Sequence, residues 1–421
     1  MEGRPFAMKI TEIETHPITI PYQEWQEYTL THYHGTNRRT IYIVHTDDGL
    51  VGLGEGGRKE SQDIIDSYIG TNPFDWIGDE TSIALGTAMY DLMGKAAGVP
   101  VYKLIGQKYR SWVPIGSWTA SGHPDRMATT VKRHAELGHT WMKFHLSPFE
   151  NVIEQTQAIQ KVAPRGFRIH YDFTMHGTED HMPELLHKLE QYEVAGCFED
   201  PLPGADIEGY IDLRKRSRLP VVLHHTELAF THDVLMGAAD AYMLGHPKIG
   251  DAIRRAGLFA AGNTPFMIQN VGGTITRAMT THMMAAFPSA NFHFIDCAEI
   301  VRDDVTIERL CPTNGFVRVP EKPGLGLDLD RKALARLKEQ NVPVPNSWIV
   351  KTTYQNGTVM YNHMNPAKSH FMVLPVRTRR LPPMKYDAPL STEYWDNDDS
   401  TEFQNMMARL EKEDVVIEQQ V

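Results

Sequence analysis

Hydrophobic and polar residues alternate along residues 8–57 as they do in β-strands. MKITEIETHPITI is followed by RTIYIVHTDDGLVGLGEGG, in which Asp47-Asp48-Gly49 predicts a hairpin turn between two β-rich runs. The period becomes helical within residues 81–106, where Ile83, Leu85, Met89, Leu92 and Met93 stand at helical spacing and a Gly-Val-Pro stop follows them. We therefore expect an α+β domain over residues 1–112.

From Val113 onward, short apolar segments alternate with helical ones. Eight of them predict strands: VPIGSW, TWMKFHL, FRIHYDF, VAGCFED, PVVLHH, ADAYMLG, PFMIQN and HFIDCAE. Eight strands with helices between them predict an α/β fold, a (β/α)8-type (modified TIM) barrel over residues 113–330. A doubly wound sheet uses the same alternation but rarely needs eight units, and no G-x-G-x-x-G follows the first strand.

Beyond the barrel, the pattern of residues 331–421 is weaker. We expect this C-terminal segment to return to the N-terminal domain and to continue as an extension arm. It contains the strand-like SHFMVLPV and a helix candidate whose apolar positions are Phe403, Met406, Met407 and Leu410. Such an arm would pack on its own barrel or on a neighbouring subunit; because EYWDNDDSTE is highly charged, a disordered tail is the alternative.

Composition narrows the class of partner. The 421 residues are 41% hydrophobic and 23% charged, with a net charge of −11, which is typical of a globular protein and disfavours nucleic acid or an anionic membrane as partner. No run of 18 apolar residues occurs, MEGRPFAMKI has no apolar signal segment, and three cysteines show no CxxC spacing. These features predict a cytoplasmic protein with reduced thiols.

Polar residues follow several of the predicted strands, where a barrel places its active site. Lys143 and His145 share one face of their strand because side chains alternate. Asp172, Glu199 and His225 are one βα unit apart, so they come from three successive strands and converge. Two carboxylates and one imidazole form a reasonable shell for a divalent metal.

Each of these residues also has a structural interpretation. Lys143 could be a solvated strand-end lysine, and His145 a hydrogen-bonded structural histidine. Asp172 and Glu199 would cost several kcal/mol each if buried without a partner, so a cation or a lysine must compensate them. Glu299, at the end of the eighth strand, could pair with Arg302 or Lys143. His224 has the wrong parity for the site and predicts a packing or supporting role.

At this point the chain resembles the enolase superfamily, in its mandelate racemase and muconate lactonizing enzyme-like branch, over roughly residues 8–330. The matching segments are DDGLVGLGEGG, ALGTAMYDLMGKAAGVPVYKLIG, the strand ends MKFH, YDF and FEDPLP, and GFVRVPEKPGLGLDLD. The resemblance implies that the N-terminal domain caps the barrel and determines substrate choice. It also implies a Mg²⁺ ion, held by strand-end acids, that stabilises the enediolate formed when a base removes the proton α to a carboxylate.

The chain departs from the pattern of this family at three places. The third metal ligand is ordinarily a glutamate, and His225 stands there, so Mn²⁺, Fe²⁺ or Zn²⁺ become plausible beside Mg²⁺. Lys143-Phe144-His145 replaces a Lys-x-Lys, which puts a histidine in place of the usual base. Gly245 and Gln269 stand where the aspartate–histidine dyad of the opposite face is expected.

These residues predict a metal-dependent lyase that dehydrates a sugar acid or hydroxy acid. His145 would abstract the α-proton with help from Lys143, Glu299 would hydrogen-bond the carboxylate, and His34 and Gln269 would contact the substrate. The alternatives are a racemase, epimerase or cycloisomerase of the same superfamily, and a non-catalytic descendant that serves as a binding scaffold. The partner expected is a small carboxylate, and the architecture favours a homo-oligomer.

Overall fold

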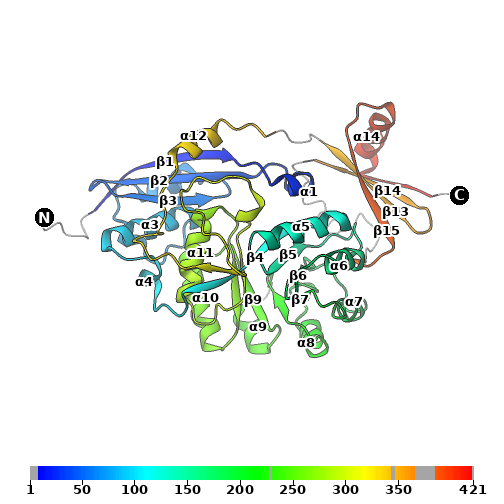
Figure 1. Ribbon diagram of the computed structural model, residues 1–421, viewed down its shortest axis with the longest axis horizontal. Helices are drawn as coiled ribbons and strands as arrows, with labels where there is room; N and C mark the ends of the chain where they lie inside the picture. Colours follow the sequence, from blue (N-terminus) through cyan, green and yellow to red (C-terminus); the bar gives the residue numbers. More distant parts are fainter. Residues whose placement is uncertain (1–7, 227–229, 343–346, 366–384, 420–421) are drawn as a thin grey trace.

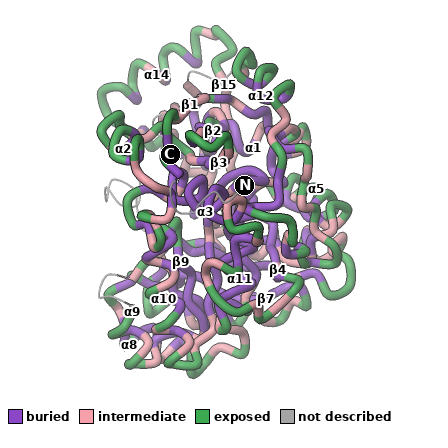
Figure 2. Tube along the Cα trace, turned by 90° about the vertical axis from the view of Figure 1, so that its left-hand side faces the viewer, coloured by how far each residue is buried: buried purple, intermediate pink, exposed green. Residues whose placement is uncertain are grey.

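The structure is a computed structural model that describes residues 8–226, 230–342, 347–365 and 385–419; the side chains of His34 and Phe230 also fall outside the described part. It contains three sheets. A three-stranded sheet lies above a nine-stranded one, and a four-stranded sheet stands beside them at the C-terminal end (Figure 1). The buried segments concentrate in the barrel strands and the overlying helix α3, whereas α14 is largely exposed (Figure 2).

The N-terminal cap is an antiparallel sheet covered by helices. Its elements are β1(Ile10–Thr19), α1(Glu24–His34), β2(Arg38–Thr46), β3(Val51–Gly56), α2(Gln62–Tyr68), η1(Pro73–Trp76), α3(Ile83–Ala97) and α4(Tyr102–Ile105). The Asp47-Asp48-Gly49 turn joins β2 to β3, as predicted, with Gly49 at φ 85°. A Cβ on Gly54 would lie 2.2 Å from the carbonyl oxygen of Ala84, so α3 packs closely on β3 only because a glycine stands there.

The barrel confirms the predicted (β/α)8 fold. Eight parallel strands run in chain order, β4(Trp112–Ala120), β5(Trp141–His145), β6(Arg168–Asp172), β7(Ala195–Glu199), β8(Val221–Leu223), β9(Ala241–Gly245), β10(Phe266–Gln269) and β11(Phe294–Ile295). Pairing of β11 with β4, Phe294 opposite Ile115, closes the ring. The antiparallel strand β12(Phe316–Arg318) pairs with the first residues of β4, Trp112 to Pro114. The carboxyl ends of the eight strands therefore meet at one mouth.

Helices separate the barrel strands and cover them. They are α5(Pro124–Glu136), α6(Val152–Gln160), α7(Met182–Leu189), α8(Ile207–Arg216), α9(Phe230–Met236), α10(Ile249–Ala261), α11(Thr274–Ala286) and the short η2(Ala298–Ile300). Polar caps start two of them: Asn151 Oδ1 accepts from the backbone N–H groups of Ile153 and Glu154, and Asp206 from that of Gly209.

The C-terminal segment forms a small domain of its own. After α12(Arg331–Lys338), which lies beside β1, come β13(Trp348–Tyr354), β14(Val359–Met364), β15(Leu390–Asp396), α14(Thr401–Glu413) and β16(Val415–Glu418), in the sheet order β15-β13-β14-β16. The predicted helix is confirmed as α14, but Phe403, Met406 and Leu410 pack on Ile349 and Val416 of its own sheet instead of the barrel. SHFMVLPV lies outside the described residues.

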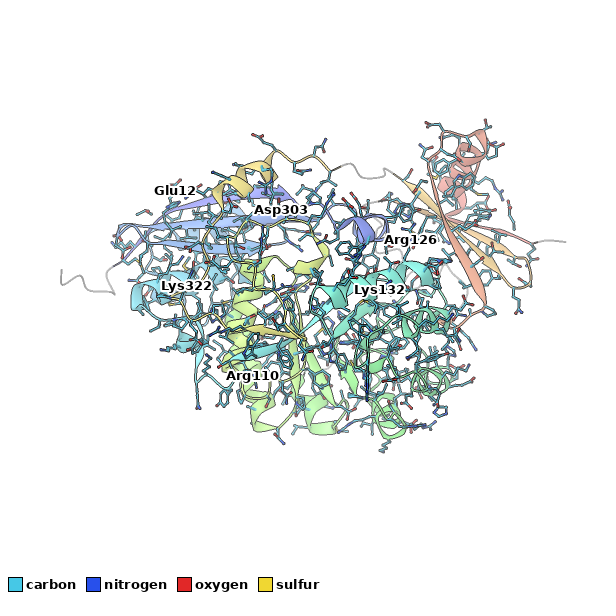
Figure 3. The ribbon with its side chains drawn as sticks, viewed as in Figure 1. Glu12, Arg110, Arg126, Lys132, Asp303 and Lys322 are labelled. Carbon is cyan, nitrogen blue, oxygen red and sulfur yellow. The ribbon has the colours of Figure 1, made fainter. Side chains whose placement is uncertain are left out.

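This domain and the barrel hold helix α1 between them. His32 Nε2 is 2.6 Å from Asp396 Oδ1 on β15. On the other side, the guanidinium of Arg126 lies over the ring of Tyr28, 4.0 Å from its centroid, and Figure 3 shows Arg126 where α5 approaches α1. Since α1 leads directly into the loop that covers the barrel mouth, both contacts fix one wall of the site.

A tyrosine ties the C-terminal domain to the strand that carries Asp172. The hydroxyl of Tyr386, a buried residue, donates to the carbonyl oxygen of Phe173. We expect Tyr386→Phe to lower the free energy of unfolding by about 1–2 kcal/mol, because a buried carbonyl loses its donor. Urea denaturation measures the change, with Tyr109→Phe, half exposed at 51%, as the matched control. Equal stability of both variants would contradict it.

Candidate active site

A cavity of about 1640 Å³ lies between the cap and the barrel mouth. From the cap, Tyr33, Asn37, Arg39 and Arg58 line it. From the barrel, it is lined by predicted site residues at the strand ends, Lys143, His145, Asp172, His225 and Gln269, and by His224. Most of the side chains singled out by their strand-end position therefore face one chamber.

Lys143 is the central charge of this chamber. Its ammonium lies 3.0 Å from Asp172 Oδ2 and donates to Glu199 Oε1 at 2.8 Å. It also donates to Gln269 Oε1 at 2.8 Å. All three partners come from different strands, and Lys143 is only 1% exposed. The solvated-lysine interpretation is therefore wrong: Lys143 compensates the two buried carboxylates.

These ionic contacts set the protonation states of the cluster. Burial alone would lower the pKa of Lys143, but Asp172 and Glu199 raise it above its ordinary value. Burial would conversely raise the pKa of Glu199, and Lys143 together with the His170 and His224 imidazoles holds it well below the usual range. The cluster consequently stays an ammonium between carboxylates across the neutral pH range.

His145 follows Lys143 by two residues and faces the same cavity, as alternation predicts. Its ring meets the ring of Tyr33 edge-on, with centroids 5.6 Å apart, and its charge would act on Asp172. It thus lies in the cavity between the cap residue Tyr33 and the carboxylate of Asp172.

The two histidines after β8 contact different carboxylates. His225 Nδ1 lies 2.5 Å from Asp200 Oδ2. Burial alone would lower the pKa of His225, and the Asp200 carboxylate raises it above the ordinary value. His224 Nδ1 lies 2.8 Å from Glu199 Oε1, which agrees with the predicted supporting role, but His224 also lines the cavity, which its parity did not predict. The strand ends at Leu223, and alternation no longer applies beyond it.

Gly245 leaves the room that His224 occupies. A Cβ at this position, where the family resemblance leads one to expect an aspartate, would lie 2.2 Å from His224 Nε2. The ring of His224, which follows β8, therefore occupies the space that a side chain at position 245 of β9 would need. The glycine at position 245 is visible in the sequence. His224, the residue it makes room for, stands 21 positions earlier, so only the fold shows that the two are neighbours.

We expect Gly245→Ala to displace the His224 ring and break its contact with Glu199. Inserting a methyl group into a filled site typically costs about 1–3 kcal/mol. Gly257→Ala on α10 is the matched control, since a Cβ there meets nothing within 4 Å, and it should be neutral or stabilising. Thermal denaturation of both variants tests this. Equal melting temperatures of the two variants would show that the His224 ring can move without loss of stability.

Glu299 does not pair with Arg302 or Lys143. Its Oε1 accepts from the backbone N–H of Trp118 at 2.7 Å, and its Oε2 is 3.4 Å from Arg277, which in turn binds Asp296. Burial and the negative charge of Asp296 raise the pKa of Glu299 to about 7, against the attraction of Arg277. A carboxyl group that is half protonated near neutral pH can donate or accept a hydrogen bond.

A second group of ligand-type side chains lies deeper in the barrel. His170 Nδ1 is 2.9 Å from His293 Nε2, and Cys197 lies close to both; all three are buried. His170 Nε2 also approaches Glu199 Oε2 to 2.7 Å, although the angle is poor for a hydrogen bond. Burial holds the pKa of His293 well below its usual range, so its neutral imidazole supports His170 behind Glu199.

Among the described residues, the ligand atoms of Asp200, His224 and His225 lie within 4.8 Å of one another and could hold a cation, whereas the predicted set of Asp172, Glu199 and His225 does not form such a group. Asp172 and Glu199 instead contact the Lys143 ammonium, and His225 contacts Asp200. Oxygen with imidazole ligands suits Mg²⁺, Mn²⁺, Fe²⁺ or Zn²⁺. Residues that the sequence did not single out also line the cavity, among them His246, Arg39 and Arg58. The predicted His34 contact lies outside the described side chains.

Among the described helices, none has both the length and the apolar character needed to cross a membrane.

Comparison with known proteins finds a matching family for the barrel and relatives over most of the chain. Residues 126–333 match the family described as enolase C-terminal domain-like. D-xylonate dehydratase of Haloferax volcanii is 25% identical over 395 residues, covering 78% of this chain and 93% of the relative.

Solved structures share the fold. The N-succinyl Arg/Lys racemase of Bacillus cereus has a TM-score of 0.65 at 20% identity, covering 79% of this chain and 98% of that one. The dipeptide epimerase of Cytophaga hutchinsonii, solved with Mg and a dipeptide, has a TM-score of 0.65 at 18% identity, covering 78% and 98%. Over residues 126–333 the chain is therefore similar to the enolase C-terminal domain-like proteins, and its relatives over most of its length are dehydratases, racemases and epimerases.

Proposed function

We propose that the protein removes the proton α to a carboxylate in a metal-dependent reaction and dehydrates a sugar acid or hydroxy acid. The observation that carries this is the Lys143–Asp172–Glu199 cluster at the floor of the cavity, with His145 beside it. The relative from Haloferax volcanii is a dehydratase. The relatives include dehydratases, racemases and epimerases, so the class is a lyase or an isomerase.

Asp172, Glu199 and His225 are the proposed metal ligands, and His224, which touches Glu199, joins them as a candidate. A divalent cation at this position would supply positive charge to the carboxylate oxygens as the α-carbon becomes a carbanion. The Lys143 ammonium, already between two carboxylates, adds charge of the same sign from the barrel floor. Glu299, whose pKa is about 7, would hydrogen-bond the carboxylate end, and Gln269 would orient it.

His145 is the proposed base. Its neutral imidazole takes the α-proton, which leaves an enediolate. The imidazolium so formed then gives that proton to the β-hydroxyl, and the C–O bond breaks to release water and an enol that becomes a 2-keto-3-deoxy acid. A single base serves both steps when the proton and the hydroxyl leave from the same face.

A racemase or epimerase is the second candidate, and one observation favours it. His246, just after β9, lines the cavity, and burial together with nearby positive charge lowers its pKa to about 4, so it is a neutral base at neutral pH. The dyad position itself holds Gln269, which cannot accept a proton. The third candidate, a binding scaffold without catalysis, would have little reason to keep two carboxylates and an ammonium buried together.

Product analysis in D₂O distinguishes these candidates. The protein, loaded with Mg²⁺ or Mn²⁺, is incubated with a panel of aldonates and aldarates, and mass spectrometry records deuterium uptake and loss of water. Dehydration gives a 2-keto-3-deoxy acid, detected as its semicarbazone. Deuterium uptake with inversion but without loss of water would make the protein an isomerase, and no uptake across the panel would support the scaffold.

We also infer a cytoplasmic location and a homo-oligomeric state, from the cysteine usage and the architecture. A small carboxylate is the expected partner, with no role for nucleic acid or membrane.

A further inference from the structure

The cavity carries positive charge in a chain that is otherwise acidic. Among its described lining residues, six are arginine or lysine, and the only acids are Asp172 and Asp251. The whole chain has a net charge of −11. Lys143 is compensated by its carboxylates on the barrel floor, so the excess comes from the arginines above it. A low-dielectric wall strengthens such a field.

Arg39 on β2 is the most informative of these arginines. It is buried, at 9% exposure, and its side chain lines the cavity. Its closest ionic contact in the described residues is loose, with Nε 3.7 Å from Glu55 Oε1. Glu55 is occupied elsewhere, since it accepts from the backbone N–H of Gly273 at 2.6 Å and from Thr276 Oγ1 at 3.0 Å.

Two further cap arginines flank Arg39. Arg38 Nε donates to Thr36 Oγ1 at 3.1 Å, and both Arg38 and Arg58 are exposed toward the cavity. In the part of the chain that the structure describes, neither has a carboxylate within ion-pair distance. On the barrel helix α10, by contrast, Arg254 and Arg255 both reach Asp251, at 3.0 Å and 2.9 Å. The uncompensated guanidinium groups therefore gather on the cap side.

His246, which follows β9 and lines the same cavity, is affected by this positive charge. Burial is the largest cause that lowers the pKa of His246, and the positive charges of neighbouring groups, among them Arg39 and Lys143, act in the same direction, to about 4 in all. An anion bound near Arg39 would relieve both this repulsion and the incomplete pairing of the guanidinium.

We infer that the substrate carries a second anionic group, a carboxylate or a phosphate, at the end remote from the reacting carboxylate, and that Arg38, Arg39 and Arg58 bind it. This inference rests on the proposed function, in which the floor of the cavity holds the first carboxylate. A guanidinium group donates two parallel hydrogen bonds to a pair of carboxylate or phosphate oxygens. Three arginines on the cap side of the cavity therefore suit such a group. The substrate is then an aldarate or a phosphorylated aldonate instead of a simple aldonate.

Matched acids test this. Gluconate, glucarate and 6-phosphogluconate share one carbon skeleton and differ at the far end, and galactonate with galactarate repeats the comparison. Binding to the metal-loaded protein is measured by calorimetry, and deuterium exchange is measured separately. A second anion should tighten binding ~10-fold or more, as for other charge-assisted arginine contacts. Comparing glucarate with 6-phosphogluconate shows whether the second anion is a carboxylate or a phosphate.

Variants assign the effect to the cap. Arg38→Ala with Arg58→Ala, both exposed positions, should weaken binding of the preferred dianion ~10–100-fold and change aldonate binding less than ~3-fold. Arg39→Lys keeps the positive charge at this buried position but removes the planar guanidinium, so it tests whether binding needs the paired N–H donors of Arg39. Arg216→Ala on α8, 63% exposed and outside the cavity lining, is the control and should change nothing.

Every outcome decides. Turnover of aldonates with no preference for dianions would leave the proposed function standing and overturn the second anion. Arginine-dependent binding of dianions without α-proton exchange would support the anion site and refute the proposed chemistry. Equal binding of all acids by wild type and the double variant, or no binding at all, would overturn the inference.

Discussion

Replacement of Lys143 by methionine is expected to destabilise the protein by about 3–5 kcal/mol, because it leaves Asp172 and Glu199 buried without their ammonium. Methionine is also unbranched and nearly as long, but it removes the charge together with the ammonium hydrogen-bond donors. Urea denaturation of the metal-free protein measures the loss. Lys132→Met on the exposed face of α5 (Figure 3) is the matched control and should stay within about 0.5 kcal/mol of the wild type.

The pH dependence of this variant provides a second, signed test. In the wild type the pKa values of Asp172 and Glu199 are lowered, so their contribution to stability persists above their unfolded pKa and is lost only as the pH falls below it. In Lys143→Met, burial and mutual repulsion should raise these pKa values instead. Folding would then take up protons, and stability should increase from about pH 7 to about pH 5. A flat profile equal to that of wild type would show that Lys143 does not compensate the carboxylates.

Replacement of His145 by asparagine is expected to slow α-proton exchange by ~10²–10⁴-fold, the usual contribution of a general base. Asparagine approximates the shape of the imidazole but does not accept a proton at neutral pH. Deuterium uptake into the bound acid, followed by NMR, measures the rate, and calorimetry checks that binding is retained. His123→Asn, at the exposed start of α5, is the control. Exchange within about 3-fold of wild type would remove His145 from this role.

The barrel could be predicted because each of its strands and helices has a hydrophobic pattern that is visible within a short stretch of sequence. Strands of a parallel barrel are buried on both faces, so they stand out as short apolar runs between amphipathic helices. Alternation within β5 also placed Lys143 and His145 correctly on one face. In a regular strand, residues two positions apart point to the same side, so the sequence predicts which side chains face the site together.

The end of β8 could not be predicted in this way. The Asp200 carboxylate accepts the backbone N–H groups of His224 and His225, at 2.8 Å and 3.2 Å, so the chain leaves the strand after Leu223. Asp200 itself has φ 45°, a left-handed conformation. Neither feature has a sequence pattern, and together they bring His224 to Glu199 against the expected parity.

The C-terminal sheet was missed for a different reason. Its strands β13 and β15 pair in antiparallel register although 35 residues separate Tyr354 from Leu390, two residues that pair. Long-range pairing of half-buried strands produces no continuous apolar run. Only α14, with its helical spacing of apolar residues, could be recognised from the sequence.

Metal binding tests the proposed chemistry most directly. Elemental analysis of the purified protein, followed by titration of Mg²⁺ and Mn²⁺ into the apo form, would compare wild type with Glu199→Gln and with Glu184→Gln on α7, whose side chain is 71% exposed. We predict one divalent ion per chain in wild type and in Glu184→Gln, and its loss in Glu199→Gln. No binding by the wild type at millimolar metal would contradict a metal-dependent abstraction of the α-proton.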